Sequence, residues 1–337
     1  MNNSTKTRIQ KAISVLYESY KPKGWGLIEW QHVDELIVDN PWLVSDEISG
    51  FCVSNAIVGG EVTDHTVLQV SVISKRPLKD LSREQVVSRT LNFPEPIGEI
   101  NIDVVESGEV KLNTAVGCHH ENNPNNIGTV SAILSFAGSE RNFPVIISNK
   151  HVFGYPEASY NMNGKITHLD SGISMSRGII GFPFYRTRTG VLALKVDAAM
   201  SWVENLHDVS LKVPNHPNGN FKIDVLGPLP RVGQKLFWRG LKTFNKGLEY
   251  QGNRVSSNNQ LVRIPAGGYP GVSEPVILPR QIILNGHSQA GDSGSAMVGK
   301  RQDGTIALYG ILVGSFGSEQ IIVAPIRPIA EGLRLSV

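Results

Sequence analysis

The pentapeptide Gly291-Asp292-Ser293-Gly294-Ser295 is the most informative segment of this 337-residue chain. A serine hydroxyl is a poor nucleophile unless a base takes its proton and hydrogen-bond donors hold the oxyanion that forms. The glycine ahead of the serine lets the backbone turn, so that the N–H groups of Gly291 and Ser293 can point at one spot as an oxyanion hole. The same residue types are common in ordinary polar turns, so the pentapeptide alone leaves both interpretations open.

Two upstream segments supply the partners that a nucleophilic serine needs. A short apolar run in Val145–Phe153 is followed by His151, and in Leu194–Met200 Asp197 lies between apolar neighbours, where it needs a hydrogen-bonding partner. The order is His151, Asp197, Ser293, with 46 positions (151 to 197) and 96 positions (197 to 293) between them. The chymotrypsin-type template has the same order, with spacings of roughly 45 and 93. The pattern therefore predicts a catalytic triad.

With these motifs the chain resembles a chymotrypsin-fold (trypsin-like) serine peptidase. Within that group it is similar to the intracellular trypsin-like peptidases related to the plant Narrow Leaf proteins and their bacterial relatives. The resemblance implies that Ser293 is the nucleophile, His151 the general base and then the general acid, and Asp197 the group that orients the imidazole. It implies hydrolysis of a peptide bond through an acyl-enzyme, without a cofactor or metal. The matching segments are Gly128-Thr129, Ser148–Val152, Val196–Ala199, Gly291–Ser295, Gly310–Ser315 and Ala324–Ile326, with a looser match over Val72–Leu78 and Ile102–Gly108.

The predicted fold is mainly β, with two antiparallel β-barrels of chymotrypsin type preceded by a small α+β domain. From Gly128 onward, short apolar runs are separated by Gly, Pro and Asn without a long helical period, which is typical of antiparallel barrels. We expect one barrel to carry His151 and Asp197 and the other to carry Ser293, with domains at 1–112 and 113–337. Expected elements are strands at 129–136, 144–148, 190–196, 234–238, 281–284 and 306–313, and a closing helix at 326–337 that Gly332 disfavours.

The N-terminal region is predicted to be an α+β unit. Ser4 can cap a helix to about Tyr20, whose apolar face of Ile9, Ile13 and Leu16 packs on its own domain or, alternatively, on a partner or a second copy. The other expected elements are strands at 51–58, 65–74 and 97–105 and a helix at 81–91, which begins with a possible capping box from Ser82 to Gln85.

Three segments have an alternative interpretation. Ile57–Gly60 matches the new N-terminus of activated digestive enzymes, but it lies 94 positions (57 to 151) before His151, so we interpret it as strand and hairpin. If no freed N-terminal amine pairs with Asp292, this carboxylate needs another partner. The polar segment 109–126 is expected to be a linker, with a loop at Asn122–Asn126. Cys118-His119-His120 lacks a second ligand pair at zinc-finger spacing, so a loop without metal is favoured.

The substrate preference is less constrained than the chemistry. In the digestive enzymes an aspartate lies six residues before the serine, and here that position is His287. The strand that pairs with substrate in those enzymes corresponds to Val313-Gly314-Ser315. Both departures argue against a simple Arg/Lys preference. His287 either lines the pocket and favours acidic or polar side chains, or is a hydrogen-bonded structural histidine. The basic residues of the hairpin 240–247 are expected to be a solvated edge.

Composition narrows the compartment and the partners. The formal net charge of +2 is too small to indicate nucleic acid or an anionic membrane as the main partner. Cys52 and Cys118 are the only cysteines, which favours a reducing compartment. Residues 1–24 contain no apolar core of a signal peptide, and no segment reaches the roughly 18 apolar residues of a membrane span. We expect a bacterial cytoplasmic protein whose partner is a protein or peptide substrate, with a regulatory partner or homo-oligomer possible.

Three functions remain open from the sequence. The first is an active endopeptidase of narrow specificity, restrained by the N-terminal domain, a partner or assembly. The second is a protease effector of a bacterial defence system that a partner activates. The third is a protease fold that serves only as a binding module, which the complete triad of His151, Asp197 and Ser293 argues against.

Overall fold

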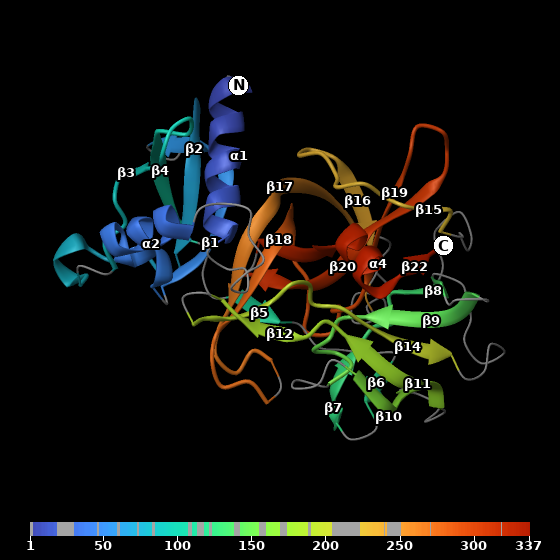
Figure 1. The fold of residues 1–337 in the computed structure, drawn as a ribbon. Helices are drawn as coiled ribbons and strands as arrows, with labels where there is room; N and C mark the ends of the chain where they lie inside the picture. The colour runs from blue at the N-terminus through green and yellow to red at the C-terminus, as the bar shows by residue number, and fades with distance from the viewer. Residues whose placement is uncertain are drawn as a thin grey trace.

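The computed structural model is mainly β, with two antiparallel sheet units and an N-terminal unit of helices and strands (Figure 1). The predicted fold class is therefore confirmed. The structure describes residues 3–18, 30–45, 47–58, 61–72, 74–82, 85–106, 110–112, 118–120, 123–137, 142–154, 160–168, 174–187, 190–203, 223–238, 240, 251–269, 271–317 and 319–337.

Six strands of the C-terminal half close into an antiparallel barrel. They pair in the order β18-β21-β20-β19-β16-β17, and β17 pairs back with β18. Apolar side chains at alternate positions, such as Ile282 and Leu284 or Ile321 and Val323, fill one cluster, as the period of two in a strand requires. The strands are β16 (Lys235–Trp238), β17 (Gln251–Ile264), β18 (Val276–Asn285), β19 (Ala296–Lys300), β20 (Ile306–Phe316) and β21 (Gln320–Pro325).

A second antiparallel sheet lies beside the barrel and is ordered β22-β8-β9-β14-β11-β10-β6-β7. Its strand β9 is buried on both faces: Ile146 packs into one apolar cluster and Ile147 into another, which explains its uninterrupted apolar run. The strands are β6 (Cys118–His120), β7 (Asn123–Gly128), β8 (Ala132–Ala137), β9 (Asn142–Ser148), β10 (Tyr160–His168), β11 (Ser174–Gly181), β14 (Ala199–Val203) and β22 (Leu335–Ser336).

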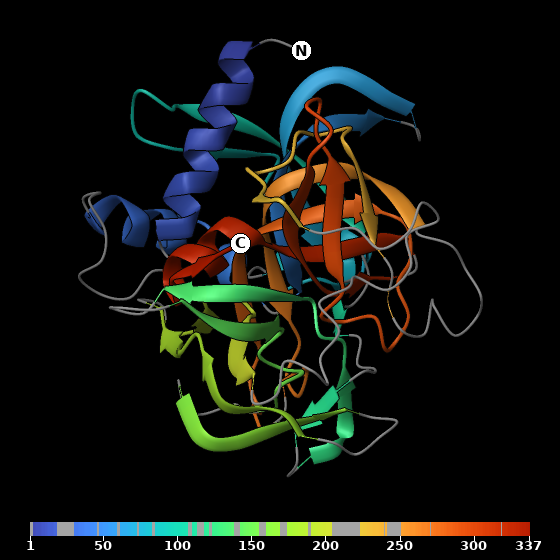
Figure 2. The same ribbon diagram turned by 90° about the vertical axis from the view of Figure 1, so that its right-hand side faces the viewer.

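The C-terminal helix α4 (Ile326–Leu333) lies between the barrel and the second sheet (Figures 1 and 2). Its buried residues Ile326, Ile329 and Leu333 share one cluster with side chains of both sheet units. The predicted helix is confirmed but ends earlier than expected, because Arg334 adopts a left-handed conformation with φ 54°. The chain then returns as β22, which pairs with β8.

The N-terminal unit continues the barrel sheet. Strand β1 pairs with β17 through Phe51 and Leu261, and the order continues to β2, β4 and β3. Ile9, Ile13 and Leu16 of α1 pack on β1 and β2 in a cluster that also contains barrel residues, so the helix packs on its own domain, as we predicted. The elements are α1 (Asn3–Glu18), α2 (Trp30–Asp39), η1 (Pro41–Val44), β1 (Ile48–Val58), β2 (Glu61–Val72), η2 (Leu78–Asp80), β3 (Thr90–Asn92) and β4 (Glu99–Glu106).

The expected helix at 81–91 is wrong. The capping contact does form, since the Ser82 N–H donates to Gln85 Oε1 at 3.1 Å. None of the described residues of this range is α-helical, and Thr90 and Leu91 begin strand β3, because Leu91 is only 1 % exposed and pairs with β4 in the N-terminal core. Tertiary burial overrides the local helix signal here. Ser4 lies inside α1 rather than ahead of it, and α2 was not predicted.

The expected linker also contains strands. Strand β5 (Val110–Leu112) pairs with barrel strand β20, although the predicted boundary places it in the first domain. The expected loop at Asn122–Asn126 is wrong for its described residues, because β7 pairs with β6. Pro124 fits there, since β7 is the last strand in the sheet order and an edge strand tolerates a residue without an N–H. Four further short strands or strand pairs complete the fold: β5, β12 (Phe184–Arg186), β13 (Leu192–Leu194) and β15 (Val225–Leu226).

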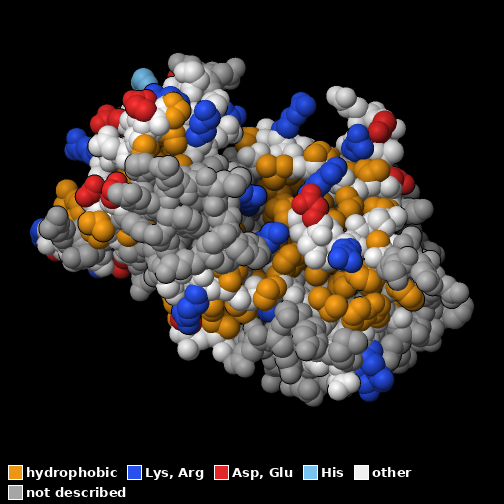
Figure 3. Space-filling view, in the orientation of Figure 1, with side chains coloured by type: hydrophobic (Ala, Val, Ile, Leu, Met, Phe, Trp, Pro, Cys, Tyr) orange, Lys and Arg blue, Asp and Glu red, His pale blue; other side chains and the backbone are white. Residues whose placement is uncertain are grey.

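Two expectations from the composition concern charge on the surface and membrane-spanning segments. On the face shown in Figure 3, Lys and Arg side chains of the described residues are scattered, and several of them lie beside Asp or Glu side chains. In the described part of the chain, no helix is both long and apolar enough to cross a membrane.

Candidate active site

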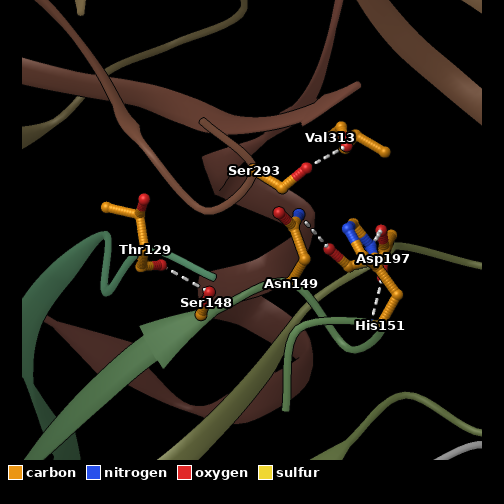
Figure 4. Close-up of polar contacts among 7 residues, drawn as sticks. All are labelled: Thr129, Ser148, Asn149, His151, Asp197, Ser293 and Val313. Carbon is orange, nitrogen blue, oxygen red and sulfur yellow. Dashed lines mark hydrogen bonds and ion pairs between the residues drawn. The ribbon is translucent and has the colours of Figure 1, made fainter. Parts of the chain in front are cut away.

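The three residues of the predicted triad lie on loops at the ends of strands (Figure 4). His151 follows β9, Asp197 lies between β13 and β14, and Ser293 lies in the connection from β18 to β19. His151 therefore follows a strand of the second sheet, Asp197 connects β13, which pairs with the barrel strand β18, to β14 of the second sheet, and Ser293 belongs to the barrel. Loops held by rigid strands are the usual place for such groups.

His151 and Asp197 form a buried hydrogen-bonded pair. Nδ1–H of His151 donates to Asp197 Oδ2 at 2.6 Å, and the backbone N–H of His151 donates to Oδ1 at 3.3 Å. Their side chains are 1 % and 0 % exposed. Asn149 adds a bond from Nδ2 to the Asp197 carbonyl at 3.0 Å. Because the carboxylate holds Nδ1–H, the other ring nitrogen of His151 is the one available to accept a proton.

Two glycines shape the Ser293 loop. Gly291 has φ 130° and Gly294 has φ 91°, conformations that side-chain-bearing residues rarely adopt. The N–H groups of Asp292, Gly294 and Ser295 donate to backbone carbonyls, whereas those of Gly291 and Ser293 have no acceptor among the residues that the structure describes. The two N–H groups predicted to hold an oxyanion are thus the ones that the loop leaves available.

Asp292 has the alternative partner that the sequence required. The backbone N–H of Gln289 donates to Asp292 Oδ2 at 2.8 Å, within the same loop. Gly240 lies against this carboxylate, since a Cβ there would be 2.0 Å from Oδ1. Ile57-Val58 ends strand β1, where it pairs with Val62 and Glu61 of β2. The other residues of the 240–247 hairpin and Gly59-Gly60 lie outside the described residues.

Thr129 joins the second sheet to the serine loop. Its N–H donates to the Ser293 carbonyl at 2.9 Å, and its hydroxyl donates to the Gly291 carbonyl at 3.2 Å. Ser148 Oγ in turn donates to the Thr129 carbonyl at 2.6 Å. These bonds hold the loop that carries Ser293 in register with the strand that precedes His151.

Replacing Gly294 by Ala is expected to displace this loop. The added Cβ would lie 1.9 Å from the Thr129 carbonyl oxygen and 2.5 Å from Ser148 Oγ, at a residue with φ 91°. Backbone strain and overpacking of this kind destabilise by about 1–3 kcal/mol each. Thermal unfolding and the rate of fluorophosphonate labelling of Ser293 measure the two consequences.

Gly304→Ala is the matched control for that prediction. Gly304 has a similar φ of 86°, but a Cβ there would meet nothing within 4 Å. It therefore reports the backbone strain alone, and labelling of Ser293 should proceed at the wild-type rate. Equal stability and labelling in the two variants would contradict the role assigned to the close contact at Gly294.

The hydroxyl of Ser293 points at a backbone carbonyl in this structure. Its Oγ donates to the Val313 carbonyl at 2.8 Å, and the residue is 0 % exposed (Figure 4). A hydroxyl has a single proton to donate. Ser293 must therefore rotate away from Val313 before His151 can receive that proton.

Lys150, the residue before His151, is a buried cation that sequence reasoning did not assign. Its Nζ donates to the Phe182 carbonyl at 2.8 Å and lies 4.9 Å from the centre of the Phe184 ring. Burial lowers the pKa of Lys150 from 10.5 to about 8, although the negative charge of Asp197 opposes this shift. The only sequence signal was a lysine three positions after the apolar run Val145–Ile147.

The stability of the wild type is expected to rise relative to Lys150→Met between about pH 8 and 10.5. The folded-state pKa of Lys150, about 8, lies below its ordinary value of 10.5, so the unfolded chain binds more protons in this window. The difference in free energy of unfolding should change by about 3 kcal/mol. Denaturant unfolding of both proteins at several pH values measures it, and parallel curves would contradict a buried Lys150.

Tyr269 is a second neighbour that the sequence did not reveal. The residue is 2 % exposed, and its ring stacks edge-on against His151 at 5.9 Å and against Phe184 at 5.5 Å between ring centres. Its buried hydroxyl makes no hydrogen bond of ordinary distance and angle among the described residues, but it lies close enough to the Asp197 carboxylate to interact with it. Burial, and then the negative charge of Asp197, hold the pKa of Tyr269 well above its usual range, so the phenol stays protonated.

Tyr269→Ala is expected to destabilise the protein by about 3–5 kcal/mol, as loss of a buried aromatic ring does. It should also slow the labelling of Ser293, since His151 loses the ring that it packs against. Tyr269→Phe keeps the ring and removes only a buried hydroxyl that makes no well-formed hydrogen bond, so its free energy of unfolding should stay within about 1 kcal/mol of wild type. Chemical denaturation compares the three proteins, and a Phe variant as unstable as the Ala variant would show that the hydroxyl, not the ring, matters.

The three predicted specificity residues differ in how far they are exposed to solvent. His287 is exposed in the loop before the serine, Ser315 is 6 % exposed, and Val313 is fully buried. The Val313 side chain belongs to the core cluster, so only its backbone faces Ser293. The assignment of these residues to a substrate pocket stays a prediction.

The cysteine–histidine segment lies in a strand rather than in the expected loop. Cys118, His119 and His120 form β6, between β10 and β7. Within the described ranges, no group of three or more His, Cys, Asp or Glu side chains is placed to hold a metal ion.

A scan against protein-family models found no family that matches this chain, and a search of curated proteins found no match. Solved structures with a similar arrangement are serine proteases. They include a glutamic-acid-specific serine protease that uses a histidine triad in substrate binding, at 15% identity over 61% of this chain and 92% of that one, with a TM-score of 0.41. A Nocardiopsis protease shares 14% identity over 68% of this chain and 98% of that one, with a TM-score of 0.43. The chymotrypsin of Cellulomonas bogoriensis shares 13% identity over 68% of this chain and 98% of that one, with a TM-score of 0.41.

Proposed function

We propose that this protein is a serine endopeptidase that hydrolyses peptide bonds through an acyl-enzyme. The observation that carries the proposal is the buried bond of 2.6 Å between His151 Nδ1 and Asp197 Oδ2, on strand ends joined through Thr129 to the Ser293 loop. A buried carboxylate that orients an imidazole, together with a serine on a glycine turn, fits nucleophilic acyl transfer.

Each residue has one role in the proposed reaction. Ser293 Oγ bonds to the scissile carbonyl carbon while its proton passes to His151, and the carbonyl oxygen becomes an oxyanion held by the N–H groups of Gly291 and Ser293. The C–N bond then breaks, and His151 gives the proton to the leaving amine. A water molecule repeats the sequence on the acyl-enzyme and releases the acid and Ser293. Asp197 stabilises the charged imidazole in both halves.

The enzyme is proposed to have a narrow substrate range and a regulated site. His287 is exposed and lies six residues before Ser293 in the chain. Its imidazole would favour acidic or polar side chains of the substrate. A cleavage profile of a peptide mixture from a proteome tests this preference. Cuts dominated by Arg or Lys before the scissile bond would contradict it.

A cytoplasmic location is also proposed, because the chain has only Cys52 and Cys118. A bacterial source is proposed on the sequence resemblance alone. Fractionation of cells that produce the protein from its own gene tests the compartment. Recovery in a secreted or periplasmic fraction would contradict the proposal.

The experiment that tests the chemistry is intact mass after incubation with a small fluorophosphonate. The wild type should gain one adduct, and Ser293→Ala should gain none, because only an oxyanion-stabilised serine with a base reacts readily. Absence of any adduct on the folded wild type would overturn an assembled active site. It would then favour a partner-activated effector or a binding module.

A further inference from the structure

Strand β5 is paired with the part of the barrel that adjoins Ser293. Its three residues run antiparallel to β20, with Leu112 opposite Gly314, Lys111 opposite Ser315 and Val110 opposite Phe316. The residue before this paired region is Val313, whose carbonyl accepts the hydrogen bond of Ser293. The pairing therefore begins one residue from the nucleophile's partner.

This segment of β20 has no remaining open edge. On its other side the same residues pair with β21, where Gly314 lies opposite Ile322 and Ser315 opposite Ile321. An extended peptide binds a sheet by adding a strand to an unpaired edge. A peptide that enters beside Ser293 along β20 can therefore pair with Gly314–Phe316 only in the position that β5 takes.

The direction of β5 also matches that of an extended peptide on this edge. Because it is antiparallel to β20, the chain runs toward Val313 as it goes from Val110 to Leu112. A peptide in the same register would present the bond that follows it toward the serine. The hydroxyl of Ser293 meanwhile points at Val313, not into an attack on a carbonyl.

We propose that residues 110–112 are an autoinhibitory strand that occupies the peptide-binding edge of this protease and must leave before a substrate can pair there. The inference rests on the proposed function and names how that same site is regulated. A three-residue strand forms a short ladder, so a longer substrate or a partner that binds the strand can displace it. The site is then closed in the isolated chain by the chain's own backbone.

The first test is Lys111→Pro, compared with Lys111→Ala. Proline removes the backbone N–H and places a ring in the ladder, whereas alanine keeps the N–H and changes only the side chain. Loss of about one ladder hydrogen bond corresponds to roughly a tenfold change in occupancy. Hydrolysis of a peptide mixture by Lys111→Pro should rise by about tenfold or more, with Lys111→Ala near wild type.

Small-fluorophosphonate labelling separates the two proposals, because that reagent needs Ser293 but no strand pairing. Labelling of the wild type and both variants at similar rates, with faster peptide hydrolysis only in Lys111→Pro, supports the inference. Similar labelling with unchanged hydrolysis overturns the autoinhibitory strand and leaves the proposed function intact. Equal activation by Lys111→Ala also overturns it. Failure of all three folded proteins to label overturns the proposed function instead.

A measurement on the wild type removes the dependence on a variant that folds. A tripeptidyl phosphonate is attached to Ser293, the adduct is verified by mass, and amide hydrogen exchange is compared with the small fluorophosphonate adduct. The peptidyl adduct should raise exchange in 110–112 while 314–316 stay protected, since the inhibitor replaces β5 on the edge. Unchanged protection of 110–112 in the peptidyl adduct would refute the proposal.

Discussion

Ser293→Ala is expected to lower kcat for peptide hydrolysis by about 10⁶-fold, because nucleophile, base and oxyanion donors act as one unit. His151→Ala should cause a loss of similar size, since Ser293 Oγ then has no base. The double variant should lose no more than either single variant, for the same reason. Initial rates on a peptide mixture, with folded protein verified by thermal unfolding, measure these losses.

The structure offers a control for that prediction. Ser295 lies in the same loop, and its hydroxyl donates to the Asp292 carbonyl. Ser295→Ala should therefore keep most of the activity that Ser293→Ala loses. If Ser295→Ala is the inactive variant and Ser293→Ala is active, the nucleophile has been assigned to the wrong serine.

Asp197→Asn is expected to lower kcat by about 10⁴-fold while leaving the fold intact. Asp197 accepts the Nδ1–H of His151 at 2.6 Å, and an amide in its place can donate instead. The proton of the imidazole then moves to the other ring nitrogen, which can no longer receive the proton of Ser293. The rate of hydrolysis and of fluorophosphonate labelling should fall together.

Asn149→Ala is the comparison for Asp197→Asn. Asn149 bonds the backbone carbonyl of Asp197 at 3.0 Å, not its carboxylate. Its loss disturbs the position of Asp197 without changing the imidazole tautomer, so the rate should fall far less. A loss in Asn149→Ala as large as in Asp197→Asn would mean that position, rather than tautomer, dominates the effect.

The main features of the barrel could be predicted from the sequence because they are local. The apolar runs of β18 and β20 mark strands that are buried on both faces, since their alternate residues enter two different core clusters. Glycines mark turns whose φ values other residues avoid. The incorrect predictions also rested on local signals, which strand pairing with residues distant in the chain overrides. Gln85 caps Ser82 as a helix start would, yet the chain pairs as β3, and the Asn-rich Asn123–Gly128 pairs as β7.

The surroundings of the candidate site were beyond sequence reasoning for a similar reason. Tyr269 and His151 are 118 positions apart (151 to 269), and nothing in a loop between β17 and β18 marks a tyrosine that packs on a histidine of the other sheet. Lys150 adjoins His151 in the chain, but its burial and lowered pKa depend on Phe182 and Phe184. Such contacts follow from packing between elements, not from spacing along one element.

Residue types and their order were sufficient to nominate His151, Asp197 and Ser293, because that chemistry needs those groups in a chain order typical of one fold. The fold in three dimensions was needed to show that Ser293 donates to Val313 and that β5 covers the adjoining edge of β20. A hydroxyl rotates within its site, and Val110 and Phe316 pair across 206 positions (110 to 316). Neither a rotamer nor a distant strand pairing leaves a periodic pattern in the sequence.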